Sequence, residues 1–201
     1  MSTDVQDYID LGDSVQDLDV SLLINNAGYA NLCPFDEEEY TELERMIKTN
    51  IGPYVYITRA ILPRMLKRDK KSGIIFTSSV AAKVTLPCLS TYAATKAFND
   101  HFGQSLAYEL VDQVDVLSFL PNAVATNMNR NSPSFSTLTP AEAAQGALDA
   151  LGREIETEGY WRHAVHNKRQ RLAMCFFPKS MVMAGINKRM RGAAKMIKER
   201  N

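Results

Sequence analysis

The chain has 201 residues, of which 45% are hydrophobic, and its 23 basic residues balance 23 acidic ones. This length and apolar content are enough to bury the core of one domain, and the balanced charge gives no sign of a nucleic-acid-binding protein. Three cysteines at unrelated spacings argue against a disulfide framework and suit reduced thiols in a cytosol-facing compartment. The three histidines are scattered, so no metal site is expected.

The first predicted elements are a helix and a strand. Thr3 or Asp4 can cap a helix that extends to about Leu18. The apolar run Val20–Ile24 predicts a strand that is buried on both faces, as in the middle of a parallel sheet. The strand leads into Asn25-Asn26-Ala27-Gly28, which on its own can also be an ordinary Asn-Gly turn.

A long interrupted helix is predicted next, from about Asp36 to Met65. Carboxylates gather at its start, and apolar residues recur at helical spacing along it. The Gly52-Pro53 step breaks the pattern, because proline has no amide hydrogen to donate to the preceding turn. We therefore expect a kink directly after Asn50.

A second strand leads to a group of polar residues that could take part in catalysis. The apolar run from Gly73 reads as a buried parallel strand that ends at Ser79, and the following helix carries Tyr92 and Lys96 as far as about Val111. Residues four apart share a helix face, so the Lys96 ammonium is expected to lower the pKa of the Tyr92 phenol from about 10 towards neutrality. Such a phenol exchanges a proton with a carbonyl or alcohol oxygen, to which Ser79 can also donate a hydrogen bond. The Tyr-Lys spacing alone is common on helices.

The third strand is predicted from Val114 to Leu120 and is followed by Pro121-Asn122-Ala123-Val124-Ala125-Thr126. Residues 127–138 are rich in Asn, Ser and Pro and are expected to form a mobile substrate loop. Thr139-Pro140-Ala141-Glu142 predicts the capped start of a helix. We expect a last strand at Gly159–Val165, and we assign His163 and His166 to it rather than to a zinc site.

The C-terminal tail differs in charge from the rest of the chain. From Lys168 to the end, ten Lys or Arg face one acid, so the tail carries a formal charge of +9 and residues 1–167 carry −9. We therefore expect an α/β domain at residues 1–167 and a basic helical tail at residues 168–201. The tail can contact an anionic membrane surface, RNA, or an acidic patch on a partner or on its own domain, or it can simply be solvated.

For the membrane alternative, the last helix offers an apolar side of Met181, Val182, Ile186, Met190 and Ile197. The apolar run around it is short and is interrupted by Pro178, so no transmembrane helix is expected. The polar N-terminus is unlike a signal peptide.

These motifs, in this order, resemble the short-chain dehydrogenase/reductase family over nearly the whole chain. The resemblance implies an α/β fold with a Rossmann-type parallel sheet and helices on both faces. It implies that the four catalytic positions are Asn50, Ser79, Tyr92 and Lys96, with Tyr92 as the proton donor and Asn50 as a relay whose main-chain carbonyl binds a water. It implies cofactor-binding positions at Asn26, Ala27, Gly28, Tyr92, Lys96, Pro121, Val124 and Thr126.

Several strings are similar to one branch of that family, the microsomal very-long-chain 3-oxoacyl-CoA reductases and the 17-beta-hydroxysteroid dehydrogenases. They are Ser90–Phe98, Val124–Met128, Pro133–Phe135 and Gly159–Ala164. The branch implies NADP(H), or alternatively NAD(H), as cofactor and an acyl-CoA or a steroid as the lipid substrate. It also implies the cytosolic face of the endoplasmic reticulum membrane, or otherwise the cytoplasm.

The chain lacks the usual start of the family, because its ten glycines form no G-x-x-x-G-x-G turn. With the family's strand order 3-2-1-4-5-6-7, we expect an N-terminally truncated sheet that keeps strands 4-5-6-7. Three accounts are open: a truncated product of a complete reductase, a non-catalytic subunit or scaffold, and a half-domain completed by another polypeptide. In each account the outer edge of the Val20–Ile24 strand is open, which predicts a homo-oligomer or a partner chain there.

Overall fold

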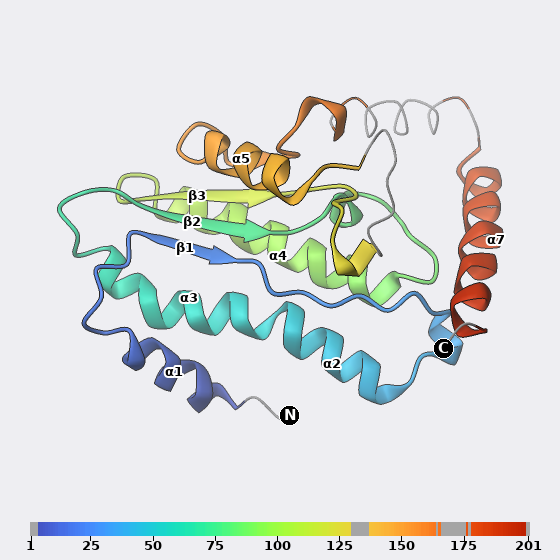
Figure 1. Ribbon diagram of the computed structural model, residues 1–201, viewed down its shortest axis with the longest axis horizontal. Coiled ribbons are helices and arrows are strands. Elements are labelled where there is room, and N and C mark those ends of the chain that lie inside the picture. The colour runs from blue at the N-terminus through green and yellow to red at the C-terminus, as the bar shows by residue number, and fades with distance from the viewer. Residues whose placement is uncertain (1–3, 130–136, 164, 166–175, 177, 200–201) are drawn as a thin grey trace.

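The computed structural model describes residues 4–129, 137–163, 165, 176 and 178–199. Their centre is a parallel sheet of four strands: β1 (Leu22–Asn25), β2 (Ser72–Thr77), β3 (Val114–Phe119) and β4 (Glu156–Thr157). The strands lie side by side in chain order, as Figure 1 shows. This order confirms the predicted second half of a Rossmann-type sheet.

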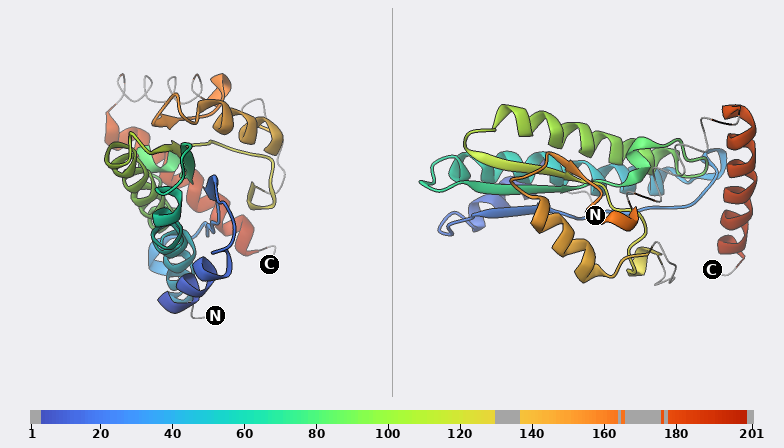
Figure 2. Two further views of the ribbon diagram at one scale, coloured as in Figure 1. Left: turned by 90° about the vertical axis from the view of Figure 1, so that its left-hand side faces the viewer. Right: turned by 90° about the horizontal axis from the view of Figure 1, so that it is seen from above.

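Helices lie on both faces of the sheet, also as predicted. The described helices are α1 (Val5–Ser14), α2 (Tyr40–Asn50), α3 (Gly52–Met65), α4 (Ser90–Glu109), α5 (Pro140–Ala150) and α7 (Lys179–Lys198). Three short 3-10 helices join them: η1 (Phe35–Glu37), η2 (Val80–Lys83) and η3 (Asn127–Asn129). The views in Figure 2 place α5 on one face of the sheet and α3 and α4 on the other.

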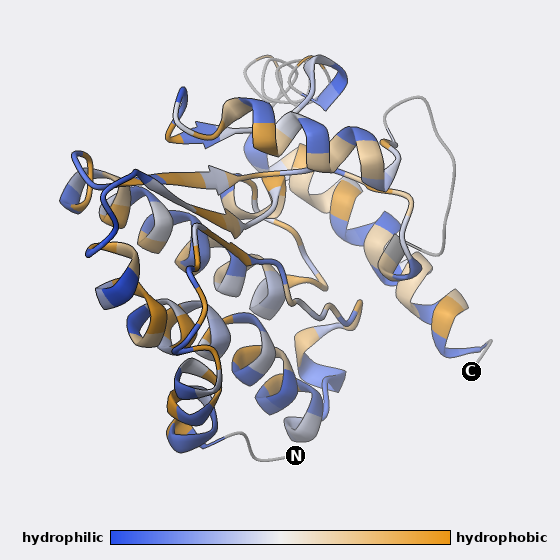
Figure 3. Cartoon of the chain, turned by 60° about the vertical axis from the view of Figure 1, so that its left-hand side comes forward, coloured by the Kyte–Doolittle hydropathy of each residue, from blue (hydrophilic) through white to orange (hydrophobic). Residues whose placement is uncertain are grey.

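The core consists of two clusters, because successive side chains of a strand point to opposite faces. On one face, Ile74, Phe76 and Val116 pack against α3 and α4. On the other face, Ile75 and Leu117 pack against the alanines of α5. Figure 3 shows the apolar strands enclosed by helices that alternate between hydrophobic and hydrophilic positions. Burial of β2 and β3 on both faces explains their continuous apolar runs in the sequence.

The helix predicted to begin near Asp36 begins instead at Tyr40, and Asp36 lies in the 3-10 helix η1. Two other predicted helix starts are correct in their chemistry. Asp4 caps α1 in a capping box with Asp7, and Thr139 caps α5 in a capping box with Glu142. Helix α1 ends at Ser14, earlier than the predicted Leu18, and it packs against α3.

The predicted last strand at Gly159–Val165 is wrong. The chain pairs with β3 only at Glu156–Thr157, and Trp161 to His163 are helical. Aromatic residues favour strands, which explains the error. Gly159 turns the chain instead, since its φ of 75° lies in the left-handed region, and its α-carbon lies against the Phe119 ring.

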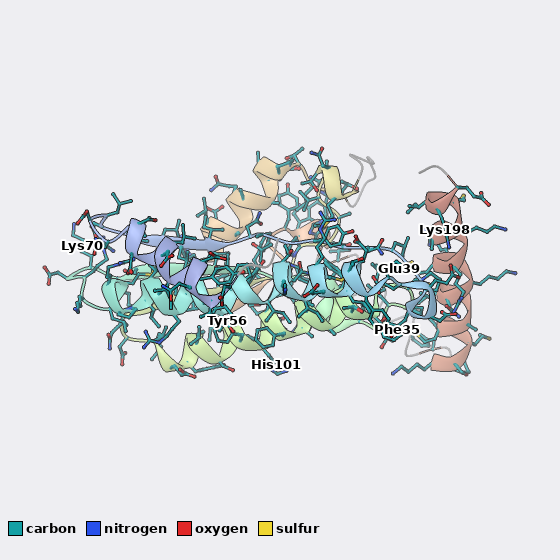
Figure 4. All side chains as sticks on the ribbon, turned by 90° about the horizontal axis from the view of Figure 1, so that it is seen from below. Phe35, Glu39, Tyr56, Lys70, His101 and Lys198 are labelled. Atoms are coloured by element: carbon teal, nitrogen blue, oxygen red, sulfur yellow. The ribbon has the colours of Figure 1, made fainter. Side chains whose placement is uncertain are left out.

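Helix α7 lies across the carboxyl ends of the strands, as both Figure 1 and Figure 2 show. Arg191 contacts Asp36 at 3.5 Å and Lys198 contacts Glu37 at 3.2 Å, so the basic tail meets the acidic run at η1. Figure 4 shows the labelled Phe35 of η1 beside α7. Ala194 is buried, and Val182, Ile186, Met190 and Ile197 are half-buried.

This burial favours packing of the tail on its own domain over the membrane alternative, although Met181 is exposed. Among the described helices, none is long and apolar enough to cross a membrane. The predicted boundary between residues 167 and 168 falls outside the described residues.

The outer side of β1 is uncovered. Leu22 is 38% exposed and Ile24 is 50% exposed, so the prediction that this strand is buried on both faces is wrong. β1 is the first strand of the described sheet, and α1 packs on α3 rather than beside it. An apolar edge strand without proline or an inward-pointing charge is a template for pairing with another chain.

We predict that the purified chain self-associates through β1. Replacing Ile24 by Lys should shift the mass seen by light scattering towards the monomer, because a charge on β1 disfavours edge pairing. Ile47→Lys is the control, since Ile47 is exposed to a similar extent on α2. A wild-type chain that is monomeric at all concentrations would contradict this prediction.

A second prediction uses two glycines in helices. A Cβ on Gly146 of α5 would lie 1.9 Å from the Gly159 carbonyl oxygen, whereas a Cβ on Gly192 of α7 would meet nothing within 4 Å. Gly146→Ala should therefore lower the free energy of unfolding by about 1–3 kcal/mol or more. Gly192→Ala should stabilise α7 by about 0.5–1 kcal/mol. Urea titrations followed by circular dichroism test both, and equal effects would show that the close approach of α5 to Gly159 is absent.

Candidate active site

The predicted site residues converge at the carboxyl ends of the parallel strands. Gly28 follows β1, Ser79 follows β2 and Pro121 follows β3, so all three loops open at one end of the sheet. Tyr92 and Lys96 lie in the first two turns of α4, which packs against η2 directly after Ser79.

The end of β2 is tied to α4 by two hydrogen bonds and to α3 by a third. The Ser78 hydroxyl donates to the main-chain oxygen of Lys96 at 2.7 Å. The carbonyl of Thr77 accepts from Lys96 Nζ at 2.8 Å and from the Tyr54 hydroxyl at 2.9 Å. These bonds fix the height of α4 relative to the strand, and with it the position of Tyr92 relative to Ser79.

Ser79 and Tyr92 face each other across this junction. The Ser79 oxygen accepts a hydrogen bond from the Ala81 amide at 3.2 Å, so the Ser79 hydrogen is free to point elsewhere. Burial raises the pKa of Tyr92, and a hydrogen bond with Ser79 partly opposes that rise. The expectation that Lys96 lowers this pKa towards neutrality is therefore wrong for the structure as it stands.

The position of Lys96 explains this result. Its Nζ is directed to Thr77 and lies 5.9 Å from the centroid of the Tyr92 ring. The residue is only 3% exposed, and burial lowers the pKa of Lys96 to about 8. At this distance, burial of the phenol itself has the larger effect on the pKa of Tyr92.

Asn50 connects three parts of the site and is completely buried. Its Oδ1 accepts from the Tyr29 amide at 2.7 Å, and its Nδ2 donates to the Tyr29 carbonyl at 2.9 Å. The same Nδ2 donates to Thr95 Oγ1 at 2.9 Å. The loop after β1 is thereby fixed to the end of α2 and to α4.

Asn99 is a polar residue of the site that the sequence analysis missed. Its Nδ2 donates to the Asn50 main-chain carbonyl at 2.9 Å, so a side chain already contacts the carbonyl that was expected to hold a water. Asn99 is fully buried, and its Oδ1 has no hydrogen-bond partner among the described residues. Asn99 could have been found from the sequence by its position three residues after Lys96, which puts both side chains on the same helix face.

The loop after β1 leaves room for a ligand. A Cβ on Gly28 would lie 3.4 Å from Lys96 Nζ and 3.8 Å from Asn50 Oδ1, so the glycine keeps the space beside both groups open. Asn26 and Ala27 are exposed next to it.

The loop after β3 borders Ser79. The Pro121 carbonyl accepts from the Val80 amide at 3.2 Å, and Val124 pairs with Leu138. Thr126 is exposed, while the predicted substrate loop is described only at residues 127–129 and 137–138. The Asn122 amide donates at 3.2 Å to Nδ1 of the buried His163, whose contribution the sequence did not reveal.

These residues fit one half of a nicotinamide dinucleotide and not the other. The open space at Gly28 and the exposed Thr126 can accept the nicotinamide and its ribose beside Tyr92. A pyrophosphate needs a helix N-terminus without competing negative charge. The Gly-rich turn G-x-x-x-G-x-G that precedes such a helix in the family is not formed by the ten glycines of the sequence.

A family model for the short chain dehydrogenase matches residues 2–136. Because this match covers more than half of the chain, the chain belongs to the short-chain dehydrogenase/reductase family.

Two proteins with similar sequences differ in function. A very-long-chain 3-oxoacyl-CoA reductase of Anas platyrhynchos is 34% identical over 168 residues, which are 80% of this chain and 53% of the relative. An inactive hydroxysteroid dehydrogenase-like protein 1 of Homo sapiens is 31% identical over 166 residues, which are 79% of this chain and 50% of the relative. The chain therefore spans about half the length of the curated relatives it matches.

A solved structure supports the fold. A short chain dehydrogenase from Burkholderia cenocepacia J2315, in complex with NADP, superposes with a TM-score of 0.72 and 27% identity. The match covers 91% of this chain and 76% of that chain.

The burial of Lys96 predicts how stability depends on pH. The pKa of Lys96 is about 8 when folded and 10.5 ordinarily. Between these values the unfolded chain binds the proton more, so the free energy of unfolding should rise by about 2 kcal/mol from pH 7 to pH 9.5. Lys96→Met should remove this rise, and Lys67→Met, at an exposed position, should retain it.

Urea titrations at the two pH values provide the measurement. The lost hydrogen bond to Thr77 shifts the stability of the Lys96→Met variant at both pH values alike. Parallel pH dependences of wild type and Lys96→Met would mean that Lys96 is solvated.

Proposed function

We propose that residues 4–165 form the proton-donating half of an NADP(H)-dependent short-chain reductase that converts a keto group to a hydroxyl. The observation that carries this proposal is the junction of Ser79, Tyr92 and Lys96 at the carboxyl end of β2. Very-long-chain 3-oxoacyl-CoA reductase relatives support an acyl-CoA substrate, with a steroid ketone as the alternative in the same class.

The protonation state of Tyr92 suits reduction. Because burial raises its pKa, the phenol keeps its proton at neutral pH and can donate it to a carbonyl oxygen. Ser79 accepts from Ala81, hydrogen-bonds to Tyr92 and orients the phenol, and its hydroxyl is placed to contact the same substrate oxygen.

Lys96 and Asn50 help to return a proton to Tyr92 after Tyr92 has donated its own. With a pKa of about 8, Lys96 is mostly protonated at pH 7 and can release its proton readily towards Tyr92. Asn50 binds the Tyr29 amide and so holds the loop that contains Gly28 in place beside Lys96.

A bound nicotinamide supplies the hydride. Asn26, Ala27 and Gly28 on one side, and Pro121, Val124 and Thr126 on the other, would hold its ribose and carboxamide. The sequence has no Gly-rich turn for its phosphates, so we expect residues 1–201 alone to bind NADPH only weakly.

A second candidate function is that of a non-catalytic subunit. Two observations favour it: the missing phosphate site and the 31% identity to an inactive hydroxysteroid dehydrogenase-like protein of Homo sapiens. Both candidates share the fold, so only chemistry separates them.

A fusion protein tests the proposed function. Residues 1–201 are joined to the part of the duck reductase that precedes the matched region, and NADPH oxidation is followed with a 3-oxoacyl-CoA. Tyr92→Phe should lower kcat by about 10²- to 10⁴-fold, the contribution of general acid catalysis, with the Kd for NADPH unchanged. Tyr108→Phe is the matched control, because Tyr108 lies on α4 and is 72% exposed.

The outcomes separate the candidates. A fusion that folds and binds NADPH but reduces neither the acyl-CoA nor a steroid ketone supports the non-catalytic subunit. Normal turnover by Tyr92→Phe removes Tyr92 from the proton-donor role.

A further inference from the structure

Two cysteines that are far apart in the sequence meet near the active site. Cys33 lies between β1 and η1, and Cys88 lies two residues before α4 begins at Ser90. The Cys33 amide donates to the Cys88 carbonyl at 3.0 Å. This hydrogen bond holds the two main chains in direct contact, and disulfides join residues whose Cα atoms lie about 4.4–6.8 Å apart.

The backbone at Cys88 has an unusual conformation. Its φ is 64°, and among the described residues it is the non-glycine with a positive φ. This conformation is unfavourable for a residue with a Cβ, so glycine or asparagine is the usual choice. Such outliers concentrate at functional positions, which suggests that the cysteine side chain has a use here.

Both cysteine side chains are sheltered. Cys88 is 7% exposed and Cys33 is half-buried. Burial raises the pKa of Cys33, and the nearby acids Glu38 and Glu37 and the Cys88 thiol add to this rise. Burial also raises the pKa of Cys88.

Helix α7 influences both thiols. Lys198 opposes the raised pKa of Cys33, and Arg191 opposes that of Cys88. The same two cations pair with Glu37 and Asp36, so the tail covers the cysteine pair as well as the acidic run.

We propose that Cys33 and Cys88 are a redox pair that forms an intramolecular disulfide. The oxidant is a low-molecular-weight disulfide such as glutathione disulfide. The Cys33 thiolate attacks one sulfur of the oxidant and releases one glutathione thiolate. The Cys88 thiolate then attacks the Cys33 sulfur, forms the new bond and displaces the second glutathione. Two protein thiols are oxidised, one glutathione disulfide is reduced, and the two thiol protons end on the two glutathiones.

The closed bond would join the two loops that flank the proton donor. One is the loop that begins with Asn26–Gly28, and the other is the turn that leads into the helix of Tyr92. The thiol state of this pair therefore sets how far the two loops can separate. This inference does not depend on the proposed reductase activity.

Peptide mapping of the full chain tests the proposal. The three cysteines fall in different tryptic peptides, residues 1–45, 84–96 and 172–179. The reduced protein is equilibrated with glutathione buffers of increasing oxidised fraction at pH 8.5, trapped with iodoacetamide and digested without reductant. We expect the peptides 1–45 and 84–96 to appear as one linked species that has lost two hydrogens, while Cys175 remains alkylated.

Variants control the assignment. Cys33→Ser and Cys88→Ser should each abolish the linked species, and Cys175→Ser should leave it unchanged. Because the linkage is first measured in the wild type, the test stands even where one variant fails to fold. Full alkylation of Cys33 and Cys88 in every buffer, a stable glutathione adduct on Cys33 without closure, or a bond to Cys175 would each overturn the proposal.

Discussion

The missing amide hydrogen of Pro53 is the constraint on which the site depends. It breaks the long helix into α2 and α3 at Ile51–Gly52 and leaves Asn50 at the end of a helix with its polar groups directed inwards. The Asn50 side chain then binds both main-chain groups of Tyr29, and Asn99 binds the Asn50 carbonyl. Without the break, the loop after β1 would have no anchor beside α4.

Around Asn50, the protein buries polar side chains at a considerable cost in free energy. Nearly all of the described ones have hydrogen-bond partners. Lys83 bridges the buried Asp100 at 2.7 Å and Glu156 at 2.6 Å, and Ser118 donates to Asp100 at 2.7 Å. Burial lowers the pKa of Lys83, but its bonds to Asp100 and Glu156 outweigh this effect and raise it. The network joins η2, α4, β3 and β4, so the turn that begins at Ser79 is also held through Lys83.

The sequence predicted the elements where local and tertiary preferences agree. The apolar runs at Val20–Ile24 and Val114–Leu120 and the caps at Asp4 and Thr139 are of this kind. It failed at Gly159–Val165, where aromatic residues favour a strand but a glycine turns the chain. The direction of the Tyr92 pKa was also missed, because spacing gives the neighbours of a side chain and not its burial. Asn99 and His163 act through contacts that are distant in the sequence.

The order of the strands in the sheet has a consequence for synthesis on the ribosome. Each strand pairs with the strand made just before it, so the sheet grows in one direction from β1 to β4 as the chain emerges. No strand has to be inserted between two that are already paired. The slow steps are the long parallel crossovers, each of which must bring a helix back onto the sheet. Helix α7 follows the sheet along the chain and docks on an acidic surface that is made much earlier, at η1.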